Sequence, residues 1–151
     1  MKIIVDTNIV FSSLLSKANS SKIVLLSDKF VFYSPNYMAI EIFNLKEKII
    51  KTSKLGENEI LEQLQYVIDR IKFVNPYIIP KNILKYAYEL CRNIDETDTP
   101  FVALSLFLNA KLLTGDKILY NGLYKLEYDN LISLRELRNF IDNSNINNMI
   151  H

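Results

Sequence analysis

Four carboxylates stand at positions from which a folded chain could bring them together. Asp6 comes directly after the apolar run "KIIV", and Asp116 follows the apolar segment "AKLLT" by two residues. Glu41 lies at the margin of an apolar stripe with helical spacing, and Asp98 precedes the very apolar segment "TPFVALSLFLN". Taken singly, each has a structural explanation as a helix cap, a turn residue or a solvated side chain.

As a set, these carboxylates favour a different chemistry. Clustered carboxylates repel one another, so they are tolerated only when their pKa values rise or when cations lie among them. Oxygen ligands of this kind suit Mg²⁺ or Mn²⁺. Such an ion can activate a water molecule and stabilise the charge on a phosphodiester under attack. The sequence therefore predicts a divalent metal site built from Asp6, Glu41, Asp98 and Asp116.

Alternating apolar segments indicate the elements that must position these side chains. We expect strands at residues 2–5, 29–34, 110–114 and 130–134, with one or two more short strands within 72–80. We expect helices at residues 9–15, 35–51, 57–71, 81–93, 99–109 and 135–141, the second of them capped by Ser34 with Pro35 in its first turn. Alternating strands and helices predict an α/β sandwich on a mainly parallel sheet, where ligands bind at the carboxyl ends of the strands.

Composition limits the number of domains, the possible partners and the cellular environment. The chain has 151 residues, 49% of them hydrophobic and 23% charged, which suits one domain. A net charge of +1 leaves the partner open, and a single cysteine excludes an internal disulfide and fits a reducing cytoplasm. Neither a signal peptide nor an apolar run near the ~20 residues of a membrane span is present, so we expect no membrane association. The polar end "DNSNINNMIH" predicts a domain at 1–142 and a tail at 143–151, either frayed or binding a partner.

Three motifs, in this order, resemble those of the PIN domain, a metal-dependent ribonuclease fold found in many bacterial and archaeal toxins. They are "IIVDTNIVFSSLL", "PNYMAIEIFNL" and "DETDTPFVALSLFLNAKLLTGDKIL". The resemblance implies a three-layer α/β/α sandwich and endoribonuclease activity with Mg²⁺ or Mn²⁺. It implies catalytic roles for Asp6, Glu41, Asp98 and Asp116, of which Asp6, Asp98 and Asp116 are our candidate metal ligands.

The same resemblance implies supporting roles at three further positions. Asn8 matches a polar position that helps to hold the site, Thr114 a hydroxyl position beside the last aspartate, and Asp95 an accessory acidic position. Ser105 departs from the pattern, because the family usually has alanine there.

Two other functions compete with this interpretation. A haloacid-dehalogenase-like phosphatase also begins with an apolar strand that ends in aspartate, but it usually needs a second aspartate where this chain has Asn8. A PIN-like module that binds without catalysis is the other alternative, although all four acidic positions are filled. Within the nuclease interpretation, the small size fits the toxin of a toxin–antitoxin pair, with RNA as substrate. An antitoxin protein or a second copy of the chain is then the candidate partner. The lysines that could line an RNA path, unless they form only a solvated helix face, are Lys46, Lys48, Lys51 and Lys54.

Overall fold

Five parallel strands form one sheet at the centre of the protein. The computed structural model describes the backbone of residues 1–150 and the side chains of residues 1–146. The strand order is β3-β2-β1-β4-β5, and every neighbouring pair is parallel. The strands are β1 (Lys2–Val5), β2 (Val31–Pro35), β3 (Ile71–Val74), β4 (Lys111–Leu113) and β5 (Leu131–Ile132).

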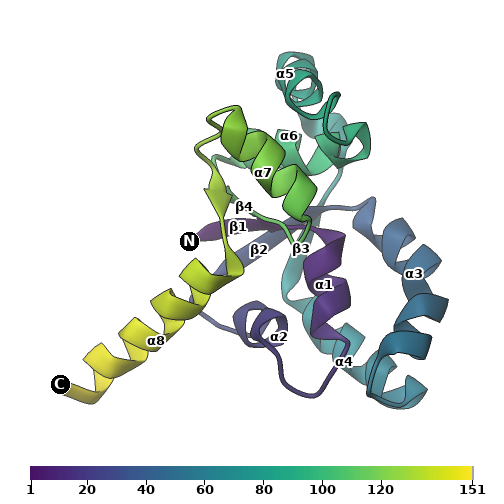
Figure 1. The fold of residues 1–151 in the computed structure, drawn as a ribbon, viewed down its shortest axis with the longest axis vertical. Coiled ribbons are helices and arrows are strands. Elements are labelled where there is room, and N and C mark those ends of the chain that lie inside the picture. Colours follow the sequence, from purple (N-terminus) through teal and green to yellow (C-terminus); the bar gives the residue numbers. More distant parts are fainter. Residues whose placement is uncertain (151) are drawn as a thin grey trace.

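Helices cover both faces of this sheet (Figure 1). One layer holds α5 (Lys81–Cys91), α6 (Thr99–Leu108) and α7 (Lys117–Lys125). The other holds α1 (Thr7–Ser13), α2 (Ser20–Leu25), α4 (Glu57–Asp69) and α8 (Leu134–Ile150), with α3 (Met38–Thr52) outermost beside α1. Two short 3₁₀ turns, η1 (Pro76–Ile78) and η2 (Glu96–Asp98), precede α5 and α6. This is the predicted three-layer α/β/α sandwich.

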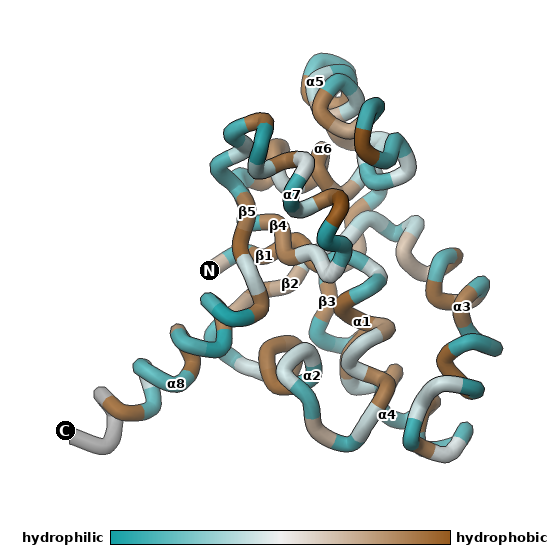
Figure 2. Tube along the Cα trace, viewed as in Figure 1, coloured by the Kyte–Doolittle hydropathy of each residue, from teal (hydrophilic) through white to brown (hydrophobic). Residues whose placement is uncertain are grey.

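The core explains why the apolar segments fold where they do. Ile3, Ile4 and Val5 of β1 are fully buried, because a central strand of a parallel sheet is covered on both faces. Residues 101–105 of α6 are buried as well, which fits a helix that is apolar all round and contacts β1, β2 and β4. Figure 2 shows the hydrophobic residues concentrated in the strands and α6, whereas α8 is largely hydrophilic along its outer turns.

The order of the strands creates the place where a site can form. The helices that follow β1 and β2 lie on one face, and those that follow β3 and β4 lie on the other. The direction of winding therefore reverses between β1 and β4, and ligands of open α/β sheets bind at such a reversal, outside the carboxyl ends of the strands. Asp6 and Asp116 follow these two strands.

Several predicted boundaries are wrong. Ser34 does not cap a helix: it lies buried in β2 with its Oγ unpaired, and Pro35 pairs with Val74 of β3 at the end of the strand. Helix α3 begins only at Met38. One strand, β3, forms at residues 71–74, in agreement with the expected one or two, whereas α2 and α7 were not predicted. The last helix, expected at residues 135–141, is longer than predicted, because α8 runs from Leu134 to Ile150.

Ser105 is accommodated by a buried hydrogen-bond network. Its Oγ donates to the carbonyl oxygen of Ala110 at 2.6 Å and accepts a hydrogen bond from the Tyr128 hydroxyl at 2.7 Å. A buried hydroxyl is costly only when it lacks partners, so this network explains how α6 tolerates serine where the resemblance suggests alanine.

Of the helices described within residues 1–150, none combines the length and the apolar character that crossing a membrane requires.

Close packing at Gly122 fixes α7 against the segment that leads to η2. A Cβ at Gly122 would lie 2.5 Å from Cδ1 and 2.8 Å from Cγ1 of Ile94. Both distances are shorter than real Cβ contacts, so a side chain here would require the Ile94 side chain or α7 to move. The absence of a side chain at Gly122 therefore lets Ile94 pack directly against α7.

We expect Gly122→Ala to lower the thermal midpoint, although alanine has the higher helix propensity by about 1 kcal/mol. The matched control is Asn121→Ala on the exposed side of the same helix, which should raise the midpoint slightly. Thermal unfolding of both variants tests this, and an equal rise in both would contradict the close packing on Ile94.

Candidate active site

Asp6 is held rigidly at the carboxyl end of β1. Its side chain is only 4% exposed. It caps α1 by accepting a hydrogen bond from the backbone N–H of Ile9 on Oδ1, at 3.0 Å. On Oδ2 it accepts hydrogen bonds from the Thr114 hydroxyl and from the backbone N–H of Gly115, the latter at 3.2 Å. Asp6 is therefore both a helix cap and a carboxylate at the carboxyl edge of the sheet, which are the two roles considered for it from the sequence.

The turn after β4 ties Asp116 to Asp6. The Thr114 hydroxyl that donates to Asp6 also accepts a hydrogen bond from the backbone N–H of Asp116, at 3.0 Å. Oδ1 of Asp116 caps α7 by accepting from the N–H groups of Ile118 and Leu119, at 2.7 and 3.1 Å. Both capping hydrogen bonds use Oδ1 of Asp116. Its Oδ2 makes no hydrogen bond among the described residues. Thr114 thus holds the two aspartates in one arrangement.

Glu41 is brought to the same edge from α3. It is half-buried, and its Oε1 accepts a hydrogen bond from the hydroxyl of Thr7 at 3.1 Å. Thr7 is the first residue of α1 and is almost fully buried, so it connects Glu41 to the residue next to Asp6. Sequence reasoning missed Thr7; the only signal was a hydroxyl residue directly after the first aspartate in "DTN".

Asp95 and Asp98 lie at the two ends of the 3₁₀ turn η2. Oδ1 of Asp95 accepts hydrogen bonds from the hydroxyl and the backbone N–H of Thr97, at 2.7 and 2.9 Å. Asp98 occupies the N-cap position of α6, as expected, but its carboxylate makes no capping hydrogen bond. Asp95 is therefore used to form the turn, whereas the carboxylate of Asp98 is left available for other interactions.

The carboxylates come close enough to change one another's pKa values. Burial first, and then the negative charges of Asp95, Asp6, Asp116 and Glu41, raise the pKa of Asp98 to about 7. Burial is also the main reason that the pKa of Asp6 rises to about 6, against the lowering effect of its three hydrogen bonds and with a small addition from Asp116. Asp98 is thus the residue on which the repulsion of the whole set converges.

The pKa values of Glu41 and Asp95 shift in opposite directions. Burial raises the pKa of Glu41, the Thr7 hydrogen bond opposes the rise, and Asp95 adds to it. The hydrogen bonds from Thr97 lower the pKa of Asp95. The fold therefore favours the charged form of Asp95. This negative charge contributes to the raised pKa values of Asp98 and Glu41.

The structure brings the four predicted acidic residues and Asp95 to one edge, but not into a closed metal cage. Within residues 1–146, no three His, Cys, Asp or Glu side chains form a group that could by itself hold a metal ion. Asn8 is exposed on α1, and a Cβ at Gly115 would lie 3.3 Å from its Cβ. Asn8 therefore packs closely beside the turn that carries Asp116, and Gly115 is the second residue that sequence reasoning missed.

Asp98→Asn should stabilise the metal-free protein in a pH-dependent way. The pKa of Asp98 lies at about 7 in the folded chain and near 3.8 without the fold, so ionising it costs free energy of folding as pH rises between these values. Below 3.8 neither state is ionised and the cost vanishes. The gain of the variant over wild type should therefore be larger at about pH 8 than at about pH 5.

Urea unfolding in EDTA at both pH values measures this difference. Asp129→Asn, at an exposed carboxylate near the start of β4, is the control and should show no comparable growth. A gain for Asp98→Asn that is the same at both pH values would contradict the crowded site.

Comparison with known proteins identifies the family of this chain. A family model described as the PIN domain matches residues 4–137. Two relatives from Mycobacterium tuberculosis, of the strains CDC 1551 / Oshkosh and ATCC 25618 / H37Rv, are named Ribonuclease VapC1. Each is 28% identical to this chain over 118 residues, which is 75% of this chain and 84% of the relative. The match does not support the haloacid-dehalogenase-like alternative. Because the family model spans most of the chain, including every acidic residue of the site, the protein belongs to the PIN domain family.

Proposed function

We propose that this protein is an endoribonuclease that uses Mg²⁺ or Mn²⁺ to cleave RNA phosphodiesters. The observation that carries the proposal is the convergence of carboxylates from separate elements on Asp98, where β1 and β4 end. Membership of the PIN domain family supports it, and so does the name of the Mycobacterium tuberculosis relatives. A structural cap or turn needs one carboxylate, whereas a crowded group with raised pKa values is typical of a functional site.

The donor set fits a hard divalent cation. Mg²⁺ is usually held by one or two carboxylates, several waters and the phosphate of the substrate rather than by a complete protein cage. The absence of a three-ligand group within residues 1–146 is compatible with that mode. A bound divalent ion would supply an activated water and would stabilise the charge that develops on the phosphodiester.

The residues of the chain have different proposed roles. Asp6, Asp98 and Asp116 are the proposed ligands, one or two of them directly and the remainder through the waters that the ion keeps. Asp6 is fixed by three hydrogen bonds, and Asp116 is oriented by its own helix cap. Glu41 is the proposed fourth catalytic residue, held by Thr7 at a half-buried position from which it can orient or accept a proton from a water. Thr114 positions two of the aspartates, while Asp95 and Asn8 shape the rim.

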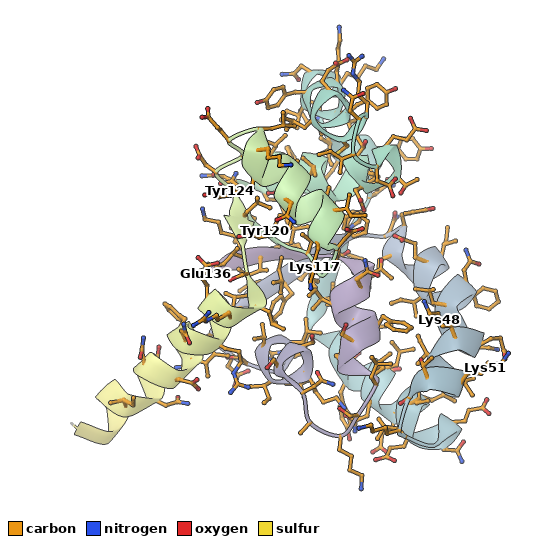
Figure 3. All side chains as sticks on the ribbon, viewed as in Figure 1. Lys48, Lys51, Lys117, Tyr120, Tyr124 and Glu136 are labelled. Carbon is orange, nitrogen blue, oxygen red and sulfur yellow. The ribbon has the colours of Figure 1, made fainter. Side chains whose placement is uncertain are left out.

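Basic side chains near the carboxylates offer a path for the RNA backbone. Lys117 follows Asp116 directly and lies between the start of α7 and α1 (Figure 3). Lys48 points from α3 towards α1, with its Nζ 5.4 Å from the ring centre of Phe11, whereas Lys51 points away (Figure 3). Of the four candidate lysines, Lys48 is thus the one we place on the path, because its side chain points towards α1, the helix that follows Asp6.

The small single domain suits the toxin of a toxin–antitoxin pair in the cytoplasm, and we propose an antitoxin protein or a second copy of the chain as its partner. The competing function is a PIN domain that binds RNA without cleaving it. All four acidic positions of the family pattern are occupied by Asp or Glu, which favours cleavage. Measuring RNA cleavage with and without a divalent ion separates the two functions.

Asp116→Asn should abolish RNA cleavage while leaving the fold intact. Asparagine keeps an oxygen for the two capping hydrogen bonds of α7 and caps helices about as well as aspartate, but it carries no charge. The measurement is cleavage of a mixed-sequence single-stranded RNA in Mn²⁺ and in EDTA, together with the thermal midpoint in EDTA. Wild-type rates in the variant, or equal rates in Mn²⁺ and EDTA, would contradict the proposal. RNA binding without cleavage by the wild type would favour the binding module.

Thr7→Val should lower the cleavage rate about tenfold, which corresponds to about 1.4 kcal/mol of activation free energy. Valine has nearly the shape of threonine but cannot donate the hydrogen bond to Glu41, so Glu41 would lose its fixed orientation. The measured quantity is kcat at saturating RNA, and Thr7→Ser, which keeps the hydroxyl, is the rescue control. Full activity in Thr7→Val would show that Glu41 needs no such support.

A further inference from the structure

An open hollow lies immediately beside the acidic edge. Its volume is about 420 Å³, which falls in the range of about 300–1,000 Å³ that small-molecule sites occupy. It is formed by the starts of α3 and α6, by η2 and by α5. The lining residues are Tyr37, Tyr88, Glu96, Thr97, Thr99 and Pro100.

The hollow is continuous with the catalytic residues along the chain. Thr97 and Thr99 are the two neighbours of Asp98. Tyr37 lies one helical turn before Glu41, whose backbone N–H donates to the Tyr37 carbonyl oxygen at 3.3 Å. A molecule that places one group at the carboxylates can therefore place its next group in this hollow.

Two aromatic rings line the hollow. Tyr37 is 41% exposed and Tyr88 is 43% exposed, although both are large side chains beside a polar site. Partly exposed aromatic rings of this kind are platforms on which nucleic-acid bases stack, whatever the base. Two tyrosines from separate helices in one hollow offer stacking surfaces that a single exposed ring would not.

Charge decides which part of a nucleic acid fits here. The lining contains no lysine or arginine, and Glu96, with Asp95 and Asp98 nearby, makes the surroundings negative. A phosphate would be repelled, whereas a neutral base would not. The hydroxyls of Thr97 and Thr99 already donate, to Asp95 and to the Glu96 carbonyl, so outwardly they can act as acceptors. Together with the Glu96 carboxylate, they suit the N–H groups on the edge of a base.

We propose that this hollow binds one unpaired nucleobase of the RNA, next to the phosphodiester that is cut. The inference rests on the proposed ribonuclease function and adds a substrate requirement to it. Bases inside a duplex are paired and stacked on one another, so they cannot enter the hollow. The site therefore selects RNA that is single-stranded at this position.

The test combines altered substrates with altered protein. A single-stranded RNA with one cut site is prepared as a series in which one nucleotide at a time, around the cut, lacks its base. For the wild type in Mn²⁺, one position beside the cut should lower kcat/KM at least about fivefold. The double variant Tyr37→Leu with Tyr88→Leu, which keeps apolar side chains but removes the rings, should show a comparable loss on the intact RNA. It should show no further loss at that position.

Two controls accompany this series. The double variant Tyr37→Phe with Tyr88→Phe keeps the rings, so it should restore most of the kcat/KM that the leucine variant loses, together with the sensitivity to the missing base. Tyr86→Ala removes a more exposed ring, 57% exposed, from the same helix as Tyr88 but outside the hollow, and should leave the positional pattern unchanged. Thermal midpoints confirm that each variant is folded.

The outcomes separate this inference from the proposed function. If the wild type cleaves no RNA in Mn²⁺, both are overturned. If the wild type cleaves but the leucine variant retains its kcat/KM, or keeps the wild-type sensitivity to the missing base, only the nucleobase site is overturned. Equal cleavage of the same sequence as single strand and as duplex would also overturn it.

Discussion

Carboxylates at the carboxyl ends of β1 and β4 repel one another, and the neighbouring residues are arranged to hold them in place despite this repulsion. Asp98 receives negative charge from Asp95, Asp6, Asp116 and Glu41, and its pKa rises to about 7 as a result of burial and of this charge. Within residues 1–146, the fold opposes the repulsion with hydrogen bonds rather than with ion pairs: Asp6 accepts three, and Asp116 accepts two at the start of α7. The remaining repulsion acts most strongly on Asp98, whose carboxylate makes no capping hydrogen bond.

The hydrophobic core makes this arrangement possible. The apolar helix α6 packs on β1, β2 and β4, so its first residue, and with it Asp98, is placed over the carboxyl ends of the central strands. Burial of β1 on both faces fixes Asp6 at the edge, and the contact of Gly122 with Ile94 sets α7 against the segment that leads to η2. Carboxylates that repel one another stay close together only if the surrounding residues are rigid, because mobile residues would let them move apart.

Much of the fold and the site could be predicted from local patterns. The run of three buried residues before Asp6, the apolar segment after Asp98 and the short strand before Asp116 each have a strong signal of their own, and the structure places all three aspartates at one edge. The start of α3 was mispredicted because Ser34 and Pro35 resemble a helix cap, whereas pairing with β3 extends β2 through both residues. The helix α2 is only six residues long, and α7 contains Gly122, a residue of low helix propensity, although its buried Leu119 and Leu123 have helical spacing. The hydrogen bond from Thr7 to Glu41 joins residues 34 positions apart, so no local pattern could indicate it.

The number of protons released when Mn²⁺ binds reports directly on the repulsion among these carboxylates. If a divalent ion relieves the repulsion at this edge, binding near pH 6.5 must displace protons that Asp98 and Asp6 hold because of their raised pKa values. Calorimetric titration of the protein with Mn²⁺ in buffers of different ionisation enthalpy measures this release. We expect Mn²⁺ to bind with net proton release near pH 6.5 and with little release near pH 8.5, where both carboxylates are already ionised. Binding without proton release near pH 6.5, or no binding at either pH, would contradict the claim.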